Sequence, residues 1–321
     1  AEEMGYADSG LAISFGVDSI PFALAALSLD PEVQGWARDF CEDTRGELIG
    51  CWAITEPDHG TDWLLSGTEE TKDPGIAPNV KAVLKGDEYI INGQKSAWVS
   101  NGTIATHASL HVSLDLSKGM KGTGVAVLRL DLPGISRGKP LDKIGQRPLN
   151  QGEIYFEDVK IPKRWMVIPE PSVLESFREM SLAQVNGGMG IVFAGLAKAA
   201  FDEAFKYSKE RIQGGKPIFE HQNIKLKLFK MFAMVESTRA LTRRMGLYNV
   251  GTMTPSGPHA VAAKVLATEC AFKVASEAIQ VFGGYGLSKE YPVEKMFRDA
   301  RASMIEDGVN ETLALAAMDF M

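Results

Sequence analysis

The spacing of apolar residues changes twice along the 321-residue chain, and these two changes constrain the fold more than any other feature. Residues 10–30 are apolar nearly all round, as expected of buried helix. Strand-length pieces separated by Gly, Pro and Asp follow, and then long stretches with apolar residues three and four apart. The pattern predicts an α+β fold with an N-terminal helical domain (1–47), a middle antiparallel β domain (48–165) and a C-terminal helical bundle (166–321).

Local signals refine this outline. In "VKAVLKGDEYIINGQK" (80–95), two alternating runs are joined by Gly86-Asp87, which predicts a hairpin, and Asn92-Gly93 predicts a second turn. Three long helices are expected over about 190–212, 221–251 and 258–282, with a final helix over about 292–304. The small residues of "GGMGIVFAG" (187–195) predict a close contact between two helices.

Composition narrows the classes of partner. A net charge of −7 and a pI near 5.4 argue against nucleic acid or an anionic membrane as the main partner. The three cysteines are widely spaced and odd in number, which favours a reducing compartment, the cytoplasm or alternatively the mitochondrial matrix. By inspection, no apolar run reaches the length of a membrane span, so none is expected.

The β domain contains one stretch that is rich in groups able to contact a ligand, "CWAITEPDHGTDW" (51–63). Thr55 and Thr61 supply hydroxyls, and Gly60 allows a ligand to approach the backbone. Trp52 and Trp98 offer flat faces that can pack on a heterocycle. A β domain with core tryptophans and polar turns explains the same residues without a ligand.

Several common sites are not supported by the sequence. The Gly-rich "QVFGGYG" (280–286) lacks the Lys and Ser/Thr of a P-loop, and no G-x-G-x-x-G motif stands between a strand and a helix. His107 and His111 lie four apart with no third ligand nearby, so a metal site is not predicted. No motif nominates a Ser or Cys nucleophile.

Asp18 is the only charged residue in the apolar run before Asp30. A buried carboxylate costs several kcal/mol unless it is paired or functional. A structural and a chemical explanation stay open. In the first, Asp18 pairs with a distant Lys or Arg or caps the turn at 19–21, and in the second it takes part in chemistry.

Taken in order, five motifs resemble the acyl-CoA dehydrogenase family of flavoproteins. They are "TEPDHGTD", "INGQKSAWVSNG", "LDKIGQRPLNQGEIYFEDVKIP", "YSKERIQGGKPIFEHQNIKLKLFKM" and "AIQVFGGYGLSKEYPVEKMFRDAR", and the resemblance runs from residue 1 to about 312. It implies N-terminal helices, a middle β domain and a C-terminal four-helix bundle, usually in a tetramer. Relatives carry one more helical segment ahead of residue 1, which implies that the N-terminal domain is incomplete here.

The resemblance implies FAD as the cofactor, an acyl-CoA thioester as the substrate and an electron-transfer flavoprotein as the acceptor. Thr55 is expected on the pyrimidine edge of the flavin ring, and Thr61 toward the acyl-CoA. The expected contacts to the flavin ring and its loop are Trp52, Ile54, Thr55, Gly60, Thr61, Trp98 and Ser100. The expected contacts to the ADP half, partly across a subunit interface, are Arg211, Gln213, His221, Gln222, Gln280, Gly283 and Gly284.

The chain departs from the family pattern at several positions. The family's Arg-x-x-Phe-Gly reads Arg211-Ile-Gln-Gly-Gly, so one aromatic contact to the cofactor is missing. Asn186 stands where an arginine is common, which puts part of the CoA site in doubt. Val309 and Glu311 replace the usual Thr and Gln beside the flavin.

The most consequential departure is in "MIEDGVNET" (304–312). Counting from the Gly-Gly pair, Asp307-Gly308 falls on the family's catalytic Glu-Gly, and Glu306 stands where Tyr is usual, a neighbour by sequence only. An Asp base is one methylene shorter, and a shift of about 1 Å can cost about 100-fold in rate. The alternative base position is Val185, which cannot serve.

Asp18 then gains a possible role, because the matching N-terminal helix lines the far end of the acyl pocket in the family. Two acids suit an alicyclic carboxyl-CoA such as cyclohexene-carboxyl-CoA, with Asp18 as a base for a ring proton, Asp307 as base or orienting acid, and Gly308 beside the thioester. The alternatives are a short- or branched-chain acyl-CoA dehydrogenase that uses Asp, a relative that performs reduction or elimination, and a non-catalytic relative.

Overall fold

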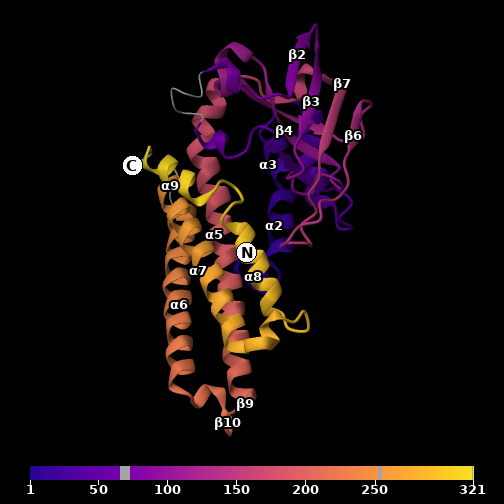
Figure 1. Ribbon diagram of the computed structural model, residues 1–321. Helices are drawn as coiled ribbons and strands as arrows, with labels where there is room; N and C mark the ends of the chain where they lie inside the picture. The colour runs from indigo at the N-terminus through magenta and orange to yellow at the C-terminus, as the bar shows by residue number, and fades with distance from the viewer. Residues whose placement is uncertain (66–72, 252–254, 320) are drawn as a thin grey trace. The chain divides into compact units, whose positions relative to one another are not determined.

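The computed structural model describes the whole chain apart from residues 66–72, 252–254 and 320 (Figure 1). The chain forms two compact units. The helical unit comprises Ala1–Ile13, Lys143–Arg147 and Glu179–Met321, and the β unit comprises Ser14–Asp142 and Pro148–Arg178. The predicted fold class is confirmed, with N-terminal helices, a middle β domain and C-terminal helices. The three domain boundaries stay a prediction, because compactness groups the chain differently.

One mixed sheet organises the β unit. Its strands follow the order β6-β7-β3-β2-β4-β5-β8, with β1 beside β4. The bounds are β1 Gly50–Ala53, β2 Lys81–Lys85, β3 Glu88–Lys95, β4 His107–Ser113, β5 Thr123–Arg129, β6 Ile135–Arg137, β7 Ile154–Pro162 and β8 Met166–Ile168. The expectation of a purely antiparallel domain is wrong at two pairs, because β4 runs parallel to both β1 and β2.

The β2–β3 hairpin is confirmed, whereas the second predicted turn is not. Lys85 pairs with Glu88, and Gly86 takes a φ of 62° in the tight turn between the strands. Asn92-Gly93 instead lies inside β3, at a register shift against β7. Gly93 has a φ of 137°, and a Cβ there would lie 2.8 Å from the Cα of Val80. The glycine therefore serves a bulge and a close backbone approach.

The first 47 residues form four short helices, so the helical pattern is confirmed but its continuity is not. These are α1 Glu2–Ala7, α2 Ser9–Asp18, α3 Ile20–Ala26 and α4 Pro31–Glu42. Asp30 caps α4 by accepting from two backbone N–H groups, and Pro31 occupies the first turn. Helices α3 and α4 pack on the sheet through Phe22 and Trp36, whose rings lie 5.0 and 5.3 Å from that of His107. They share one apolar core with the strands.

Long helices dominate the helical unit and stand side by side in Figure 1. The bounds are α5 Pro171–Glu210, α6 Gln222–Gly251, α7 Gly257–Phe282, α8 Val293–Ser303 and α9 Asn310–Met318, with a hairpin of β9 Ile212–Gln213 and β10 Lys216–Pro217 after α5. The predicted close contact is confirmed at Gly190, where a Cβ would lie 3.1 Å from the carbonyl carbon of Ala263 on α7. Helix α9 was not expected from the sequence.

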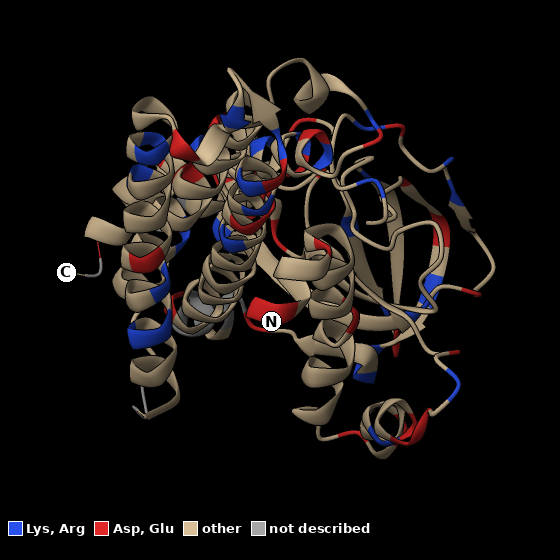
Figure 2. Cartoon of the chain, turned by 90° about the horizontal axis from the view of Figure 1, so that it is seen from below, with Lys and Arg blue, Asp and Glu red and all other residues tan. Residues whose placement is uncertain are grey.

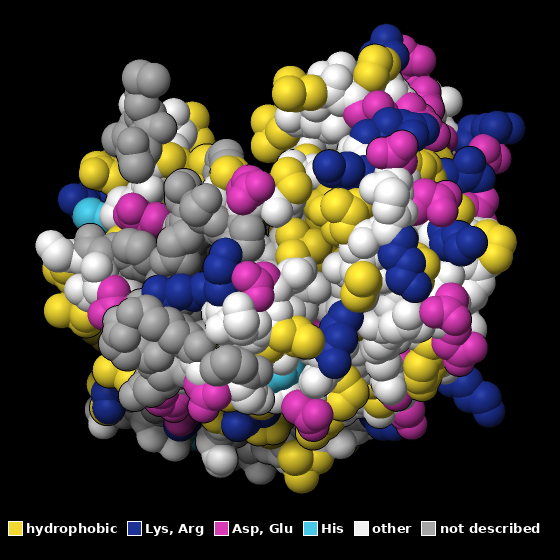
Figure 3. Space-filling model, turned by 90° about the horizontal axis from the view of Figure 1, so that it is seen from above, with side chains coloured by type: hydrophobic (Ala, Val, Ile, Leu, Met, Phe, Trp, Pro, Cys, Tyr) yellow, Lys and Arg dark blue, Asp and Glu magenta, His cyan; other side chains and the backbone are white. Residues whose placement is uncertain are grey.

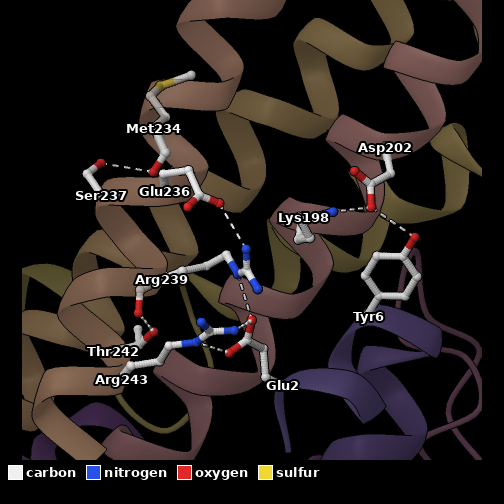
Figure 4. A network of polar contacts seen from close by, with 10 residues as sticks. All are labelled: Glu2, Tyr6, Lys198, Asp202, Met234, Glu236, Ser237, Arg239, Thr242 and Arg243. Carbon is white, nitrogen blue, oxygen red and sulfur yellow. Dashed lines mark hydrogen bonds and ion pairs between the residues drawn. The ribbon is translucent and has the colours of Figure 1, made fainter.

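Helix α1 is fastened to the rest of the helical unit by ion pairs (Figure 4). The Glu2 carboxylate accepts from Arg239 at 2.7 Å and from Arg243 at 2.9 Å, both on α6. Tyr6 donates to Asp202 on α5 at 3.1 Å. Glu2 and Arg239 are mostly buried, whereas Arg243 is exposed, and an exposed ion pair contributes up to about 1 kcal/mol.

Charges of both signs alternate along the helices in Figure 2, and they are interspersed with apolar side chains on the face shown in Figure 3. Several are paired four residues apart, as Glu294–Arg298 and Lys295–Asp299 on α8. The absence of a nucleic-acid partner stays a prediction.

Two described stretches, 9–26 and 179–210, are long and apolar enough to cross a membrane by length and composition alone. This corrects the expectation that no stretch reaches that length. The second is 67% buried inside the structure, as the core helix of a soluble protein would be, so it is weak evidence of a span.

Candidate active site

Strand β1 and the loop after it carry the first group of candidate residues in the β unit. Cys51 and Ala53 are buried in the core, while Trp52 and Ile54 alternate with them and keep some exposed surface. Thr55 lies within a hydrogen bond of Ser96, 2.8 Å between the hydroxyl oxygens. Trp52 on β1 and the next two residues after the strand, Ile54 and Thr55, are thus all partly exposed.

The second group of the β unit lies in residues 96–101. Trp98 is 59% exposed, which is unusual for an indole and leaves its ring free to pack on a ligand. Gln151 donates to the Ser100 hydroxyl at 3.2 Å. Asn101, at a φ of 62°, donates to the carbonyl of Gly50 at 3.1 Å and so ties this segment to β1. The structure therefore brings the two groups side by side.

The loop between Thr55 and Thr61 is fixed by its own backbone. Glu56 and His59 exchange two backbone hydrogen bonds, of 2.8 and 3.2 Å. Gly60 is exposed, and no atom lies within 4 Å of a Cβ built there, so its backbone is accessible as the sequence suggested. Thr61 begins a short 3₁₀ helix, Thr61–Leu65.

A buried ion pair that sequence reasoning missed lies behind the loop. The Lys95 ammonium donates to Glu56 at 2.8 Å and to the carbonyl of Ile54 at 3.0 Å, and both side chains are fully buried. Burial lowers the pKa of Lys95 to about 8, while Glu56 acts to raise it. Removing one member of such a pair typically costs about 3–5 kcal/mol. The sequence signal that could have revealed the pair is Lys95 itself, the only charged residue in "INGQKSAWVSNG".

His111 orients Trp52. The indole Nε1–H donates to His111 Nε2 at 3.0 Å. Burial, helped by the charge of Lys95, lowers the pKa of His111 to about 3, so the ring is neutral. His107, on the same strand, lies 3.0 Å from the hydroxyl of Thr106. Among the described residues, no group of three or more His, Cys, Asp or Glu could hold a metal.

Asp18 takes neither of the structural roles considered for it. Its Oδ1 accepts from the backbone N–H of Gly50 at 2.6 Å, which ties the end of α2 to the start of β1. A Cβ on Gly50 would lie 2.0 Å from the Asp18 carbonyl oxygen, so this approach requires glycine. Burial raises the pKa of Asp18, and the charge of Asp43 adds to the effect. Of the structural partners of Asp18 among the described residues, the one found is the backbone of Gly50, which the sequence had not suggested.

One groove of about 750 Å³ in the helical unit gathers the residues expected at the ADP half. Six of the seven line it, namely Arg211, Gln213, His221, Gln280, Gly283 and Gly284. Gln222, the seventh, is exposed at the first residue of α6 and does not line the groove. The chain brings them together because the β9–β10 hairpin turns sharply at Gly214 and Gly215, with φ values of 63° and 79°.

The groove fits the ADP half of FAD. No atom lies within 4 Å of a Cβ on Gly283 or Gly284, so a ligand can reach their backbone. Arg211 supplies a guanidinium suited to phosphate and lies over the Tyr285 ring, 5.3 Å from its centroid. The buried Tyr207 hydroxyl has no hydrogen-bond partner among the described residues and lines the same groove. Tyr207 and Tyr285 supply aromatic surface in a groove that lacks the family's phenyl ring.

The acid pair lies in a turn between α8 and α9, not on a helix. Asp307 has a φ of 49° and Gly308 one of 101°, both in the left-handed region. Beyond the pair, Val309 precedes α9 and the exposed Glu311 lies in its first turn. Helical geometry therefore does not decide how the two acids point.

Lys264 on α7 holds this turn. Its fully buried ammonium donates to the carbonyl of Gly308 at 2.8 Å and to Asn310 Oδ1 at 2.7 Å. Burial raises the pKa of Asp307, and the charge of Lys264 is the cause that lowers it. Sequence reasoning missed Lys264, although it is the only Lys, Arg, Asp or Glu within 257–268.

Glu306 is more than a neighbour by sequence. Its Oε2 accepts from Gln146 Nε2 at 2.9 Å. Burial raises the pKa of Glu306 to about 7, against the hydrogen bond from Gln146, and the charge of Asp307 raises it further. Gln146 is buried at a φ of 49°, and its backbone N–H donates to Asp299 on α8. The turn thus carries two interacting carboxyl groups.

Comparison with known proteins identifies the family. Residues 51–159 match the middle domain of acyl-CoA dehydrogenases, and residues 179–320 match their C-terminal domain. The mitochondrial short-chain specific acyl-CoA dehydrogenase of Rattus norvegicus is 31% identical over 307 residues, covering 96% of this chain and 70% of the rat protein.

Solved structures agree. Butyryl-CoA dehydrogenase from Megasphaera elsdenii superposes with a TM-score of 0.86 at 30% identity, covering 99% of this chain and 79% of that one. A chain from a structure described as the electron-transferring flavoprotein of Acidaminococcus fermentans superposes with a TM-score of 0.84 at 29% identity. The match covers 99% of this chain and 79% of that one. The chain belongs to the acyl-CoA dehydrogenase family, FAD-dependent flavoproteins that act as oxidoreductases on CH–CH groups.

Proposed function

We propose that Asp307 is the base in the FAD-dependent dehydrogenation of an acyl-CoA thioester. The observation that carries this proposal is the left-handed turn at Asp307-Gly308, which holds the carboxyl group beside the buried cation of Lys264. A base must be ionised before it can accept a proton, and a nearby positive charge favours the ionised form.

The residues divide the chemistry between them. Bound FAD supplies the acceptor for the hydride. The Asp307 carboxylate accepts a proton from a substrate carbon, and the backbone N–H of Asp307 donates to the thioester oxygen, where negative charge develops. Gly308, with no side chain, leaves room for the thioester.

The proposed cofactor contacts form two sets, one within each unit. In the β unit, Trp52, Ile54, Thr55, Gly60, Thr61, Trp98 and Ser100 would contact the flavin ring and its loop. In the helical unit, the groove at Arg211 and Gly283-Gly284 would hold the ADP half, with Gln222, Val309 and Glu311 as further contacts.

The favoured substrate is an alicyclic carboxyl-CoA. The Asp307 side chain is one methylene shorter than Glu, so the carbon that loses its proton must lie closer to the turn. Asp18, whose pKa is raised by burial, is the second acid that a ring substrate would use. The second candidate is a short-chain acyl-CoA, which the names of the rat and Megasphaera proteins favour.

Flavin bleaching without oxygen tests these proposals. The FAD-loaded protein would be mixed with butyryl-CoA, isobutyryl-CoA, cyclohexane-carboxyl-CoA and cyclohex-1-ene-carboxyl-CoA while the absorbance of the flavin is followed. We expect the fastest bleaching with a ring thioester. Faster bleaching with butyryl-CoA would select the second candidate, and no bleaching with any thioester would contradict the proposed function.

Asp18→Asn sharpens the choice of substrate, because the asparagine carbonyl oxygen can still accept from Gly50 while the charge is lost. We expect ring thioester turnover to fall and butyryl-CoA turnover to be unaffected. Equal turnover of the ring thioester by wild type and variant would make Asp18 structural.

Three further parts of the proposal concern the assembly and setting of the enzyme. The electron acceptor is proposed to be an electron-transfer flavoprotein, the assembly a homotetramer, and the compartment the cytoplasm. The similarity to the Acidaminococcus chain supports the first, and the family resemblance supports the other two.

A further inference from the structure

The surroundings of Lys264 are unusual for a buried lysine. Such ammonium groups normally pair with a carboxylate, because an unpaired buried charge costs several kcal/mol. Among the described residues, no carboxylate oxygen forms an ion pair with Lys264, which instead donates to the Gly308 carbonyl and to Asn310. Asn310 is fixed in turn by donating to Thr268 on α7 at 3.0 Å. The anchor is thus a closed set of neutral acceptors around a full positive charge.

The anchored turn needs such support. A non-glycine residue in the left-handed region costs about 1 kcal/mol or more, and it persists where the surroundings hold it. Asp307 is such a residue, and the next carbonyl along the chain, that of Gly308, is the one that Lys264 binds. The lysine therefore fixes the backbone directly beside the proposed base.

We propose that Lys264 is a positioning residue for the proposed base: its ammonium anchors the 304–310 turn through Gly308 and Asn310, and its charge lies near the Asp307 carboxyl group without a salt bridge to it. The inference rests on the proposed function only for the role given to Asp307. Lys264 touches neither substrate nor cofactor in this account, and it acts through the turn.

Several charged groups face Lys264 or act on the acids near it. Glu306 and Asp307 face it from the turn, and Glu311 faces it from α9. Lys143 acts on Glu306 from the 143–147 segment, and Asp299 on α8 acts on Lys143.

Among the described residues of α5 and α6, no charged group is found to act on Lys264. Helix α5 meets Lys264 at Gly190, and α6 contributes Met245 in the apolar cluster that includes Ala263. Burial lowers the pKa of Lys264 to about 8, and the charge of Asp307, the first of the three acids, acts to raise it. The interaction is mutual, so removal of the lysine charge must raise the pKa of Asp307.

Three variants of the FAD-loaded protein test the inference. Lys264→Met removes both charge and donors, whereas Lys264→Gln removes the charge but keeps an N–H₂ donor for Gly308. Lys273→Met is the matched control, a lysine of the same helix that is exposed and paired with Glu269 at 3.5 Å.

Two readouts need no turnover. Hydrogen–deuterium exchange of the peptide spanning 304–312 reports the anchor, and ¹³C NMR of labelled aspartate, assigned with Asp307→Asn, reports the titration of Asp307. We expect at least tenfold faster exchange in Lys264→Met, a smaller increase in Lys264→Gln, and an Asp307 titration about one pH unit higher in both. The control should match wild type in both readouts.

The outcomes separate this inference from the proposed function. If exchange and titration in both Lys264 variants match those of Lys273→Met, the inference is wrong, whatever the enzyme does with thioesters. If Lys264→Met does not fold, the test rests on Lys264→Gln: an Asp307 titration equal to that of Lys273→Met would contradict the inference, and a titration at higher pH would support it. The acid limb of the flavin-bleaching rate should move to higher pH with that titration. Failure of wild type to bleach contradicts only the proposed function.

Discussion

Lys95 and Lys264, the buried lysines among the described residues, lie one in each compact unit and are compensated in different ways. Lys95 in the β unit and Lys264 in the helical unit are both fully buried, and burial lowers the pKa of each to about 8. Lys95 donates to a carboxylate, Glu56, at 2.8 Å, whereas Lys264 donates to a carbonyl and an amide. The first charge is neutralised where it stands, and the second remains available to the acids of the turn.

The comparison teaches that burial by itself does not indicate a role in chemistry. An ion pair between a buried cation and a buried anion stabilises a loop, and the two opposite charges largely cancel each other's electric field at other groups. A cation held by neutral dipoles keeps its field for other groups, here Asp307 and Glu306. If this difference separates stability from catalysis, substitutions at the two sites should have opposite effects.

The largest expected effect is on turnover in Asp307→Asn. The amide cannot accept a proton, and loss of a general base typically costs about 10²–10⁴ in rate. Stopped-flow bleaching of the flavin by the best thioester measures the effect, while the bound flavin spectrum should be unchanged. A loss of less than tenfold would mean that another group is the base and that Lys264 serves no catalytic carboxylate.

For Glu56→Gln we expect a loss of stability with little loss of turnover, the opposite of Asp307→Asn. Lys95 would be left buried without its carboxylate, so the free energy of unfolding should fall by about 3–5 kcal/mol. Urea unfolding followed by tryptophan fluorescence measures it, with the exposed Glu290→Gln as the control. At a temperature where the variant is folded, its bleaching rate should stay within a few-fold of wild type. A stable variant with a large loss of rate would reverse the comparison.

Glu306→Gln tests the acid that shares the field of Lys264. The pKa of Glu306 is raised from 4.5 in the unfolded chain to about 7, so its stabilising contribution is full below pH 4.5 and is lost as pH rises through 7. The variant lacks this dependence, so its stability relative to wild type should grow by about 1–3 kcal/mol between pH 5 and pH 8. Unfolding curves at the two pH values provide the measurement, and a constant difference would contradict it.

The smallest effect is expected for His111→Phe, which removes the acceptor of the Trp52 indole N–H. One lost hydrogen bond of this kind costs about 1 kcal/mol in stability. Its second consequence, a less fixed indole, should appear as a weaker flavin-binding constant by equilibrium dialysis. Unchanged stability and flavin affinity would show that the tie from His111 does not fix Trp52.

Much of the fold follows from patterns that are local in the sequence. The helical spacing of 190–212, 221–251 and 258–282 predicted three long helices, and the alternation around Gly86-Asp87 predicted a hairpin, because these signals depend only on near neighbours. Asn92-Gly93 was misread for the opposite reason. The same dipeptide suits a turn or a bulge, and the close approach of the backbone at Val80, just before β2, decides between them.

The candidate site was predictable in part. Six of the seven residues expected at the ADP half line one groove, and Gln222 does not. The partners of the acids were not predictable. Gln146 lies 160 residues from Glu306 and Lys264 lies 44 from Gly308, and no local pattern records such pairings.

By itself, then, the sequence determined the order of helices and strands and the family, and it nominated Asp307 as the base, since each of these rests on residues close along the chain. Only the tertiary structure decided that Asp307 lies in a left-handed turn, that Glu306 shares its surroundings, and that Asp18 is tied to Gly50. The physical reason is that burial and charge depend on distances in space between segments far apart in sequence, and these distances set both the pKa of an acid and the rigidity of the turn that carries it.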